Sequence, residues 1–423
     1  MRTVVKFGGT SIKNEARIKL AAKNLTKLVK SGKQVITVVS AQGNTTTRLI
    51  QTVEKITDGQ LASKSYLEYL AMGEKMSCHL LTLALEKYGI KAVAITQDMK
   101  EFPLVSLLPS QEATTTSTKK TNEFKHFVLD EEAIRNKMER YIKPLLEQGV
   151  VPVIAGFFIV DAKRNLISLG RGGSDITSFL IGKYLNCDEV IIVTDVAGVF
   201  SSDPRQVSKA AVIDQISADD LVLLSQTGAQ VLHPNALRFK TDTFQAKIVH
   251  FKKLGNYIEA GTTIKGTVNT KIQAHKKKLT LFTFTGKNLS EKTKLFFSLL
   301  EWLVAKNLFI HSLSTGTSFI SLYLEGDIQD FVYQELHEEF IRKKKFFTGL
   351  AKLTDVGEIK ISNHLFVESP GMISMISSIL FREGINIIEM ITAHTDIVVY
   401  VKSEQIRKSV KILEQKLLST NQK

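Results

Sequence analysis

Apolar, strand-like runs alternate with amphipathic helical stretches from Val4 to about Gly261. In residues 16–30, for example, apolar side chains recur at the spacing of one helix face. This alternation is typical of an α/β domain in which helices cover a largely parallel sheet. The strands are expected at residues 3–7, 34–40, 92–96, 151–157, 189–194 and 247–251.

The second part of the chain has a different pattern. At 423 residues the chain exceeds one ordinary hydrophobic core, so more than one domain is expected. The apolar periodicity fades between residues 255 and 278, and beyond it a strand–helix–strand–strand–helix pattern occurs twice, at an offset of about 80 residues. We therefore predict a first domain over residues 1–262, a linker over 263–278 and two α+β units over 279–358 and 359–423.

Each copy of the repeat predicts particular elements. The first copy is expected to place strands at 279–285, 308–314 and 318–325 and helices at 291–306 and 327–343. The second is expected to place strands at 364–368, 386–393 and 396–401 and helices at 371–382 and 403–418. In the first domain, residues 113–125 are polar and lack an apolar period, which predicts an exposed loop or flap.

Composition excludes several classes of protein. The net charge of +14 would suit nucleic acid, but much of the excess lies at 276–278 and 342–345 without interleaved aromatic residues, so no nucleic-acid partner is expected.

The first residues run directly into a strand, and the longest apolar run, 150–160, is about half a membrane span, so neither export nor membrane insertion is indicated. Cys78 and Cys187 lie outside metal-ligand spacings, which predicts buried thiols and a reducing, cytoplasmic location.

Two glycine-rich turns each follow a predicted strand. The first, KFGGTS, places Gly8 and Gly9 beside Lys6. Glycine allows a phosphate to approach backbone N–H groups closely, and a helix starting near Ile12 would add its positive N-terminal end. Taken alone, the motif is weak and is better explained as a tight strand-to-helix turn; the second glycine turn favours the functional interpretation.

The second turn, GRGGSD at residues 170–175, adds a guanidinium, a hydroxyl and a carboxylate. Ser174 or Asp175 could merely cap a helix that starts near Ile176, but capping explains one polar residue and not the whole set. Arg171 can hold a carboxylate by a bidentate fork, which favours an acidic substrate. We predict that the two turns converge on one polyphosphate, with Lys6 close to Asp175.

The motifs of other enzyme classes are missing from the sequence. It contains no GxxxxGK[ST] and no GxGxxG followed by a suitable acidic residue, which argues against P-loop and dinucleotide sites. It also contains no HExxH, no GxSxG and no zinc-ligand pairs.

Six motifs occur in the order seen in aspartate kinases of the amino-acid kinase family: VVKFGGTS, VVSAQGNTTTRL, GEKMS, SLGRGGSDITS, TDVAGVFSSDPR and GAQVLHPNA. They extend over about 230 residues, and the tail resembles the paired ACT domains of such enzymes. The resemblance implies an open α/β/α sandwich with a mainly parallel sheet, followed by two ACT-like (βαββαβ) units. It also implies transfer of the ATP γ-phosphoryl group to the β-carboxylate of L-aspartate, the first step toward lysine (through diaminopimelate), threonine and methionine.

The resemblance also implies roles for individual residues. Lys6 would neutralise the phosphoryl group in flight, and Asp175 would organise this lysine and the magnesium. Arg171 would face the α-carboxylate of aspartate and Glu74 its ammonium, so that the β-carboxylate attacks phosphorus without a general base. The full set of expected aspartate contacts is Ser40, Thr46, Glu74, Arg171 and Ser174. Taken singly, Glu74 could be an exposed helix residue and Thr46 a helix N-cap.

The nucleotide would be wrapped by residues 194–205, which could otherwise be a long surface loop. Mg²⁺ would bind mainly through the ATP phosphates and keep several waters, so no protein ligand is assigned to it. The expected ATP contacts are Lys6, Gly8, Gly9, Thr194, Asp195, Phe200, Arg205 and Gln230.

Three residues depart from the family pattern. Phe200 stands where tyrosine is usual, Thr47 replaces a frequent Asp or Asn, and Gln230 stands where many members have lysine. The nucleotide contact of that lysine would be weaker here or supplied by Arg205. We interpret His233 as part of a helix cap rather than an acid or base, because this reaction has no proton to move.

The ACT-like units imply an amino-acid effector and pairing between chains. The loop at 309–318 contains no carboxylate, so an effector ammonium would lack its usual partner there and lysine inhibition is disfavoured. Pairing of ACT sheets would give a homodimer or a dimer of dimers.

Two other functions stay open at this point. The first is another carboxylate or carbamate kinase of the same fold, which Glu74 together with Arg171 disfavours. The second is a non-catalytic amino-acid sensor built on a decayed kinase, which Gln230 alone favours and the presence of Lys6 and Asp175 opposes.

Overall fold

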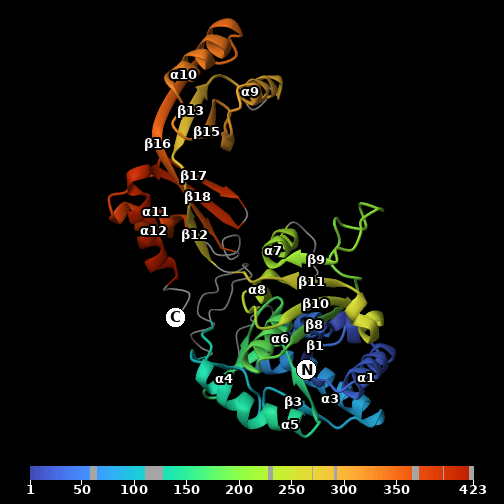
Figure 1. Cartoon of the computed structure of the whole chain (residues 1–423). Helices are drawn as coiled ribbons and strands as arrows, with labels where there is room; N and C mark the ends of the chain where they lie inside the picture. Colours follow the sequence, from blue (N-terminus) through green and yellow to red (C-terminus); the bar gives the residue numbers. More distant parts are fainter. Residues whose placement is uncertain are drawn as a thin grey trace. The chain divides into compact units, whose positions relative to one another are not determined.

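The computed structural model describes residues 1–57, 64–109, 127–226, 232–268, 270–289, 293–363, 371–393 and 395–418. The chain divides into two compact units, Met1–Val268 (unit 1) and Asn269–Lys423 (unit 2), and each is described by itself (Figure 1). The first boundary was expected after residue 262, with a linker over 263–278. That range instead contains a strand of each unit, β11 (Thr262–Lys265) and β12 (Lys271–Ala274).

The centre of unit 1 is an eight-stranded sheet in the order β3-β5-β2-β1-β8-β10-β11-β9. All neighbouring strands are parallel except β10 and β11. Strand β1 (Arg2–Phe7) lies between β2 (Gln34–Val39) and β8 (Glu189–Thr194), so the chain order reverses there. The other strands are β3 (Ala92–Ile95), β5 (Val151–Ala155), β9 (Gln215–Ser217) and β10 (Gln245–His250). The six strands predicted in this domain are therefore confirmed within three residues at each end.

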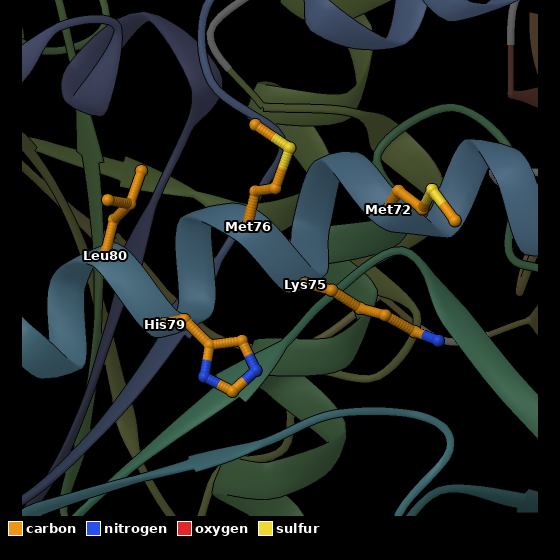
Figure 2. Close-up of a pocket in the computed structure, with 5 residues that line it drawn as sticks. All are labelled: Met72, Lys75, Met76, His79 and Leu80. Carbon is orange, nitrogen blue, oxygen red and sulfur yellow. The ribbon is translucent and has the colours of Figure 1, made fainter.

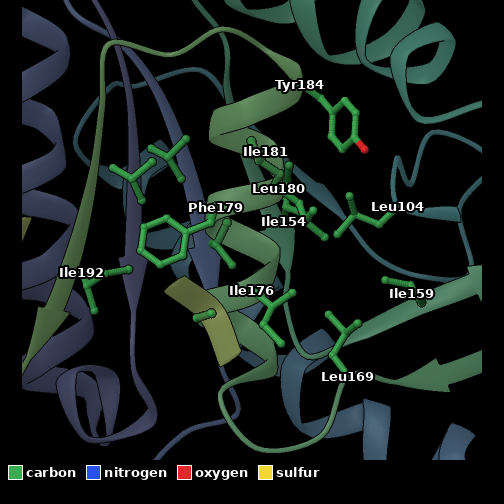
Figure 3. Close-up of a cluster of buried hydrophobic side chains, with 14 of the residues drawn as sticks. Leu104, Ile154, Ile159, Leu169, Ile176, Phe179, Leu180, Ile181, Tyr184 and Ile192 are labelled. Carbon is green, nitrogen blue, oxygen red and sulfur yellow. The ribbon is translucent and has the colours of Figure 1, made fainter. Parts of the chain in front are cut away.

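Helices cover both faces of this sheet. Successive β1 residues Val4 and Val5 belong to different buried clusters, as the alternation of a doubly covered strand requires. The cluster that contains Val5 includes side chains of α1 and of the second half of α3. The cluster that contains Val4 includes the apolar side chains of α6, which pack with Ile154 of β5 and Ile192 of β8 (Figure 3). The helices include α1 (Glu15–Lys30), α2 (Thr45–Thr57), α3 (Lys64–Lys87), α4 (Glu131–Lys137), α5 (Lys143–Glu147), α6 (Gly173–Tyr184), α7 (Ala218–Gln226) and α8 (Pro234–Leu237).

Smaller elements complete unit 1. Short helical turns are η1 (Gly9–Ile12), η3 (Met138–Ile142) and η4 (Phe251–Glu259). A second sheet contains β4 (Val105–Ser106), β6 (Phe158–Asp161) and β7 (Leu166–Ser168). Cys78 and Cys187 are buried free thiols, as expected. The flap predicted at 113–125 lies outside the described residues.

Unit 2 contains one antiparallel sheet in the order β14-β15-β13-β16-β18-β17, with β12 also paired to β16. Its strands are β13 (Leu279–Thr285), β14 (Ile310–Thr315), β15 (Phe319–Glu325), β16 (Gly349–Ser362), β17 (Glu389–Ala393) and β18 (Asp396–Lys402). Its helical elements are α9 (Thr293–Ala305), α10 (Asp330–Leu336), η6 (His337–Lys343), α11 (Met372–Arg382), η7 (Ser403–Gln405), α12 (Ile406–Leu413) and η8 (Glu414–Leu418).

The repeated pattern of unit 2 is largely confirmed. The strands and helices of both copies occur in the predicted order, except that the strand expected at 364–368 lies outside the described residues. No residue range was predicted for the long strand β16, although the βαββαβ order of an ACT-like unit implies a strand after its second helix. It pairs with β13 through its first half and with β12 and β18 through its second. Separate apolar clusters lie under the two copies. Within the described residues, no helix is long and apolar enough to span a bilayer.

Candidate active site

The candidate site lies where β1, β2 and β8 end. Phe7, the last residue of β1, pairs with Val39 of β2 and Val193 of β8, so the loops that follow these strands leave the sheet at one edge. In open α/β sheets, ligands bind at the carboxyl ends of the strands where the strand order reverses. Both predicted glycine turns lie at this edge: the first follows β1, and the second leads into α6.

Lys6 and Asp175 form an ion pair at this edge, as the sequence predicted. The Lys6 Nζ atom lies 2.5 Å from Asp175 Oδ1, and the two side chains are only 9% and 10% exposed. Lys6 is held between Val38 of β2 and Ile192 of β8, whereas Asp175 lies in the first turn of α6. Two opposite charges that are this well buried stabilise each other, and removing either would leave the other uncompensated.

Close backbone packing explains the glycines before α6. Gly172 adopts φ +73°, which L side chains rarely adopt, and an added Cβ would lie 2.4 Å from the His233 Cβ. His233 itself is the N-cap of α8, accepting a 3.4 Å hydrogen bond from the Asn235 N–H, so the predicted cap is confirmed. The second glycine turn therefore brings His233, the N-cap of α8, against the start of α6.

The first glycine turn is also tightly packed. An added Cβ on Gly9 would lie 2.6 Å from the Ala41 carbonyl oxygen, because the loop after β2 crosses directly over it. The Gly8 N–H donates to the Val193 carbonyl at 3.2 Å, so this amide, which was expected to bind phosphate, already has a partner within the sheet. Gly8 is less tightly packed than Gly9. A Cβ added there would lie 3.6 Å from Lys6 Nζ, which is an ordinary van der Waals distance.

Ser40 and Ser174 bring the two turns together. Their hydroxyl oxygens lie 2.7 Å apart, Ser40 directly after β2 and Ser174 in the first turn of α6. Gly156 makes this contact possible, because a Cβ there would lie 2.8 Å from the Ser174 Cβ. Sequence reasoning missed Gly156, which directly follows the observed strand β5 but lies inside the strand predicted over 151–157 and stands in no recognisable motif.

Glu74 is a buried carboxylate of α3 and not an exposed helix residue. It is 2% exposed, and its Oε1 accepts a 3.3 Å hydrogen bond from the Ala41 N–H, next to Ser40. Its Oε2 is buried without a hydrogen-bond partner among the described atoms. Burial raises the pKa of Glu74 to about 7, against the opposing effect of the backbone hydrogen bonds. A cationic group beside Oε2 would both pair with this carboxylate and lower its pKa.

Two other expected aspartate contacts are less enclosed. Thr46 is half-buried and lies inside the first turn of α2, which begins at Thr45, so the alternative that it caps this helix is excluded. Arg171 is exposed in the turn before α6, and no ion pair of its guanidinium occurs among the described contacts. Nothing in the described contacts joins either residue to Glu74.

The predicted nucleotide loop follows β8. Thr194 ends this strand and donates a long 3.4 Å hydrogen bond to the exposed Asp195. Phe200 is half-buried and forms an isolated bridge with Val212, whereas the Arg205 side chain is 84% exposed and pairs with Asp203 at 2.9 Å. The structure therefore does not bring Arg205 into contact with Lys6 or Asp175. Gln230 lies outside the described residues.

An apolar hollow on α3 is separate from this site. Its lining side chains come from successive turns of α3 (Figure 2), and Met72, Met76 and Leu80 among them are exposed to solvent. Lys75, one of them, pairs with Asp98 at 3.3 Å, whereas its neighbour Glu74 points into the buried site. The lining residues are Met72, Lys75, Met76, His79 and Leu80.

Comparison with known proteins identifies the family. The amino acid kinase family matches residues 1–249. The chain is 30% identical to the aspartokinase of Geobacillus stearothermophilus over 91% of this chain and 89% of the relative. It is 29% identical to an aspartokinase of Bacillus sp. (strain MGA3) over 97% of this chain and 96% of the relative.

Solved structures agree on the fold. The aspartate kinase from Synechocystis superposes with a TM-score of 0.73 at 21% identity, covering 98% of this chain and 69% of that one. E. coli aspartokinase III in complex with aspartate and ADP gives a TM-score of 0.52 at 19% identity, over 99% of this chain and 100% of that one. The chain belongs to the amino acid kinase family, among its aspartokinases. Its fold is the open α/β/α sandwich of that family followed by ACT-like elements, as the sequence predicted.

Proposed function

We propose that this chain is an ATP-dependent kinase that transfers the γ-phosphoryl group of ATP to the β-carboxylate of L-aspartate, giving 4-phospho-L-aspartate and ADP. The observation that carries this proposal is the buried Lys6–Asp175 ion pair at the edge where the strand order reverses. Membership of the aspartokinases supports it. In this step a carboxylate oxygen bonds to the γ-phosphorus and the bond from phosphorus to the β,γ-bridging oxygen breaks. No proton has to move, so no general base is required.

Lys6 and the start of α6 would supply most of the charge stabilisation. The ammonium of Lys6 can follow the phosphoryl oxygens as negative charge is redistributed, while Asp175 keeps the lysine aligned. The amino end of α6 adds a partial positive charge at the same place. Mg²⁺ would bind mainly through the phosphate oxygens and keep several waters, which suits a site in which Asp175 is already paired with Lys6.

Glu74 would recognise the ammonium of aspartate. Its Oε2 has no hydrogen-bond partner among the described atoms, and an ammonium would supply one. Its Oε1 accepts from the N–H of Ala41, the residue after Ser40, whose hydroxyl contacts that of Ser174. Arg171 would hold the α-carboxylate and Thr46 would assist, both by closing onto the bound substrate. With the ammonium and the α-carboxylate of aspartate both bound, its β-carboxylate is the group left free to react.

The nucleotide would lie against the loop after β8. Thr194, Asp195 and Phe200 would contact the base or ribose, and Lys6, Gly8, Gly9, Arg205 and Gln230 the phosphates. For Arg205 this requires release from Asp203, with which it is paired at the surface. An amino-acid effector at unit 2, a homodimer or dimer of dimers, and a role in lysine, threonine and methionine synthesis remain parts of the same proposal.

The experiment that tests the activity compares acceptors. ADP release is followed with ATP and Mg²⁺ in the presence of L-aspartate, L-glutamate or N-acetyl-L-glutamate, and the acyl phosphate is trapped with hydroxylamine. We expect ADP and hydroxamate to form together and only with aspartate at a substantial rate. Faster reaction with either other acceptor would assign a different carboxylate kinase, and no ADP with any acceptor would favour a non-catalytic sensor.

A further inference from the structure

We propose that unit 2 carries a binding site for a divalent transition-metal ion that prefers imidazole ligands, with Zn²⁺ as the best fit. Three side chains form it: His275, His311 and Glu358. Their ligand atoms all lie within 4.8 Å of one another. The site is distinct from the proposed phosphoryl-transfer site, whose residues all belong to unit 1, and does not depend on it.

Three separate segments bring these side chains together. His275 directly follows β12, and its N–H donates a 2.9 Å hydrogen bond to the Glu358 carbonyl of β16. His311 lies on β14, at the point where the β14–β15 register shifts between Ile310 and Ser312. An irregularity of this kind re-aims a side chain, here toward β16.

Side chains of β14 and β16 are in contact although the two strands are not neighbours in the sheet. These strands are separated by β15 and β13, so in a flat sheet they would lie about 14 Å apart. The His311 Nε2 nevertheless lies 2.6 Å from Glu358 Oε2. Tyr323 of β15 and Tyr400 of β18, which are also separated by two strands, stack with ring centroids 3.8 Å apart. The sheet is therefore strongly curved, and the cluster lies on its concave side.

The donor set fits Zn²⁺ better than Mg²⁺. Two imidazoles and one carboxylate are ligands that zinc accepts, whereas Mg²⁺ prefers oxygen ligands and water. Tetrahedral zinc with bonds of about 2.0–2.1 Å separates its ligands by roughly 3.3 Å, so small side-chain rotations would close the observed cluster around an ion. The His275 and His311 rings already lie with centroids 4.1 Å apart.

One ring nitrogen of the cluster has no hydrogen-bond partner. The His275 Nε2 is buried and makes no hydrogen bond with the described atoms, although Glu325 Oε1 lies 3.3 Å away. The other oxygen of Glu325 pairs with Lys277 Nζ at 2.5 Å. Glu325 is thus placed to act as a fourth ligand or to orient His275, as carboxylates around zinc-bound histidines do. The carboxylates of Glu325 and Glu358 would together balance the two positive charges of the ion. Lys277, which pairs with Glu325, is a cation next to this cluster.

A bound ion would connect β14, β16 and the segment after β12 at one point. Because a ligand that binds only the folded state stabilises it by mass action, zinc should raise the melting temperature of the protein. The competing explanation is that the His311–Glu358 pair is purely structural and holds the curved sheet without any ion.

The test uses the full chain, stripped with EDTA and then titrated with Zn²⁺ alone against a chromophoric chelator. We expect one tightly bound ion per chain, and with Co²⁺ in its place the strong visible absorption of a tetrahedral site. His275→Gln and His311→Gln should each weaken binding by about 100-fold or more, because even supporting partners of a metal ligand are worth about 10- to 100-fold. Glu358→Gln should weaken it too, although its amide can still bond to His311.

The matched control is His337→Gln, which removes an exposed histidine of the same unit outside the cluster. It should bind zinc as the unchanged protein does, and all four variants should keep their kinase rate with aspartate. Zinc binding that is equal in His275→Gln, His311→Gln and the control would overturn the proposal, as would a wild-type Co²⁺ spectrum like that of the free ion. Should a cluster variant fail to fold, this wild-type spectrum and the zinc-dependent melting temperature decide the question alone.

Discussion

The Lys6 Nζ and Asp175 Oδ1 atoms lie 2.5 Å apart in the interior of unit 1, although one residue is on the first strand and the other on the sixth α-helix. This pair joins the two glycine turns into one site. It has two separable consequences: it stabilises the fold, because each charge needs the other, and it positions the ammonium that we propose acts on the phosphoryl group.

Replacing Lys6 should separate these two consequences. Lys6→Met leaves the Asp175 carboxylate buried and unpaired, so we expect turnover to fall by orders of magnitude and the free energy of unfolding by about 3–5 kcal/mol. The double variant Lys6→Met with Asp175→Asn removes both charges and should recover most of the stability but none of the turnover. Urea unfolding and the kcat with aspartate measure the two effects. A double variant that regains turnover would contradict the proposed role of Lys6.

Glu74 should make the stability of the protein depend on pH. Burial raises the pKa of this carboxyl from 4.5 to about 7, so the folded state binds the proton more tightly than the unfolded state. Its favourable contribution is therefore complete below about pH 4.5 and is lost as the pH rises through 7, a change on the order of 3 kcal/mol. Urea unfolding without ligands at several pH values should show this loss in the wild type. Glu74→Gln should reduce the slope over this range, and an unchanged slope would show that the carboxyl titrates normally.

The same carboxyl should make aspartate binding depend on pH in the opposite sense. An ammonium pairs with ionised Glu74, so the KM for aspartate should fall as the pH rises from about 6 to 8 while the KM for ATP stays nearly constant. In Glu74→Gln the KM for aspartate should be high and almost independent of pH. Parallel changes in both KM values would place Glu74 outside the aspartate pocket.

Arg171 and Arg205 are a matched pair of exposed guanidiniums with different proposed partners. Arg171→Ala should raise the KM for aspartate by about tenfold or more, because a hydrogen-bonded charge is worth roughly 1.5–3 kcal/mol, with little effect on the KM for ATP. Arg205→Ala should have the reverse pattern. Initial rates with each substrate varied separately give the four constants. Equal effects of Arg171→Ala on both substrates would refute its assignment to the α-carboxylate.

Much of the site could be predicted from sequence because the ends of parallel strands meet at one edge of a sheet. Lys6 and Ser40 follow from this rule once the strands are located, and Asp175 follows from the glycine turn before a helix. The rule says nothing about loops that close onto the site only in the folded chain. Arg205 shows this limit: the resemblance implies a phosphate contact for it, whereas its side chain pairs with Asp203 at the surface, so that contact stays a prediction.

Other features could not be predicted because their causes are contacts between distant segments. Gly156 is required by the Cβ of Ser174, and no local pattern signals such a requirement. Strand β16 was missed because it changes partners midway, from β13 to β12 and β18, and its alternation of apolar and polar residues breaks at the change. The cluster of His275, His311 and Glu358 depends on the resulting curvature, so no sequence spacing could reveal it.

Gly172 and Gly170 allow the cost of a conformation to be separated from the cost of a contact. Both adopt φ +73°, but an added Cβ at Gly172 would lie 2.4 Å from the His233 Cβ, whereas nothing lies within 4 Å of one at Gly170. Gly170→Ala should therefore lower the free energy of unfolding by only about 1–2 kcal/mol, the cost of a left-handed alanine. Gly172→Ala should cost more and should also lower the kcat, because relieving the clash moves either His233 at the N-cap of α8 or the start of α6, which carries Ser174 and Asp175. Urea unfolding and steady-state kinetics of the two variants test this. Equal stability losses with unchanged kcat in both would mean that the contact between these two segments does not position the site.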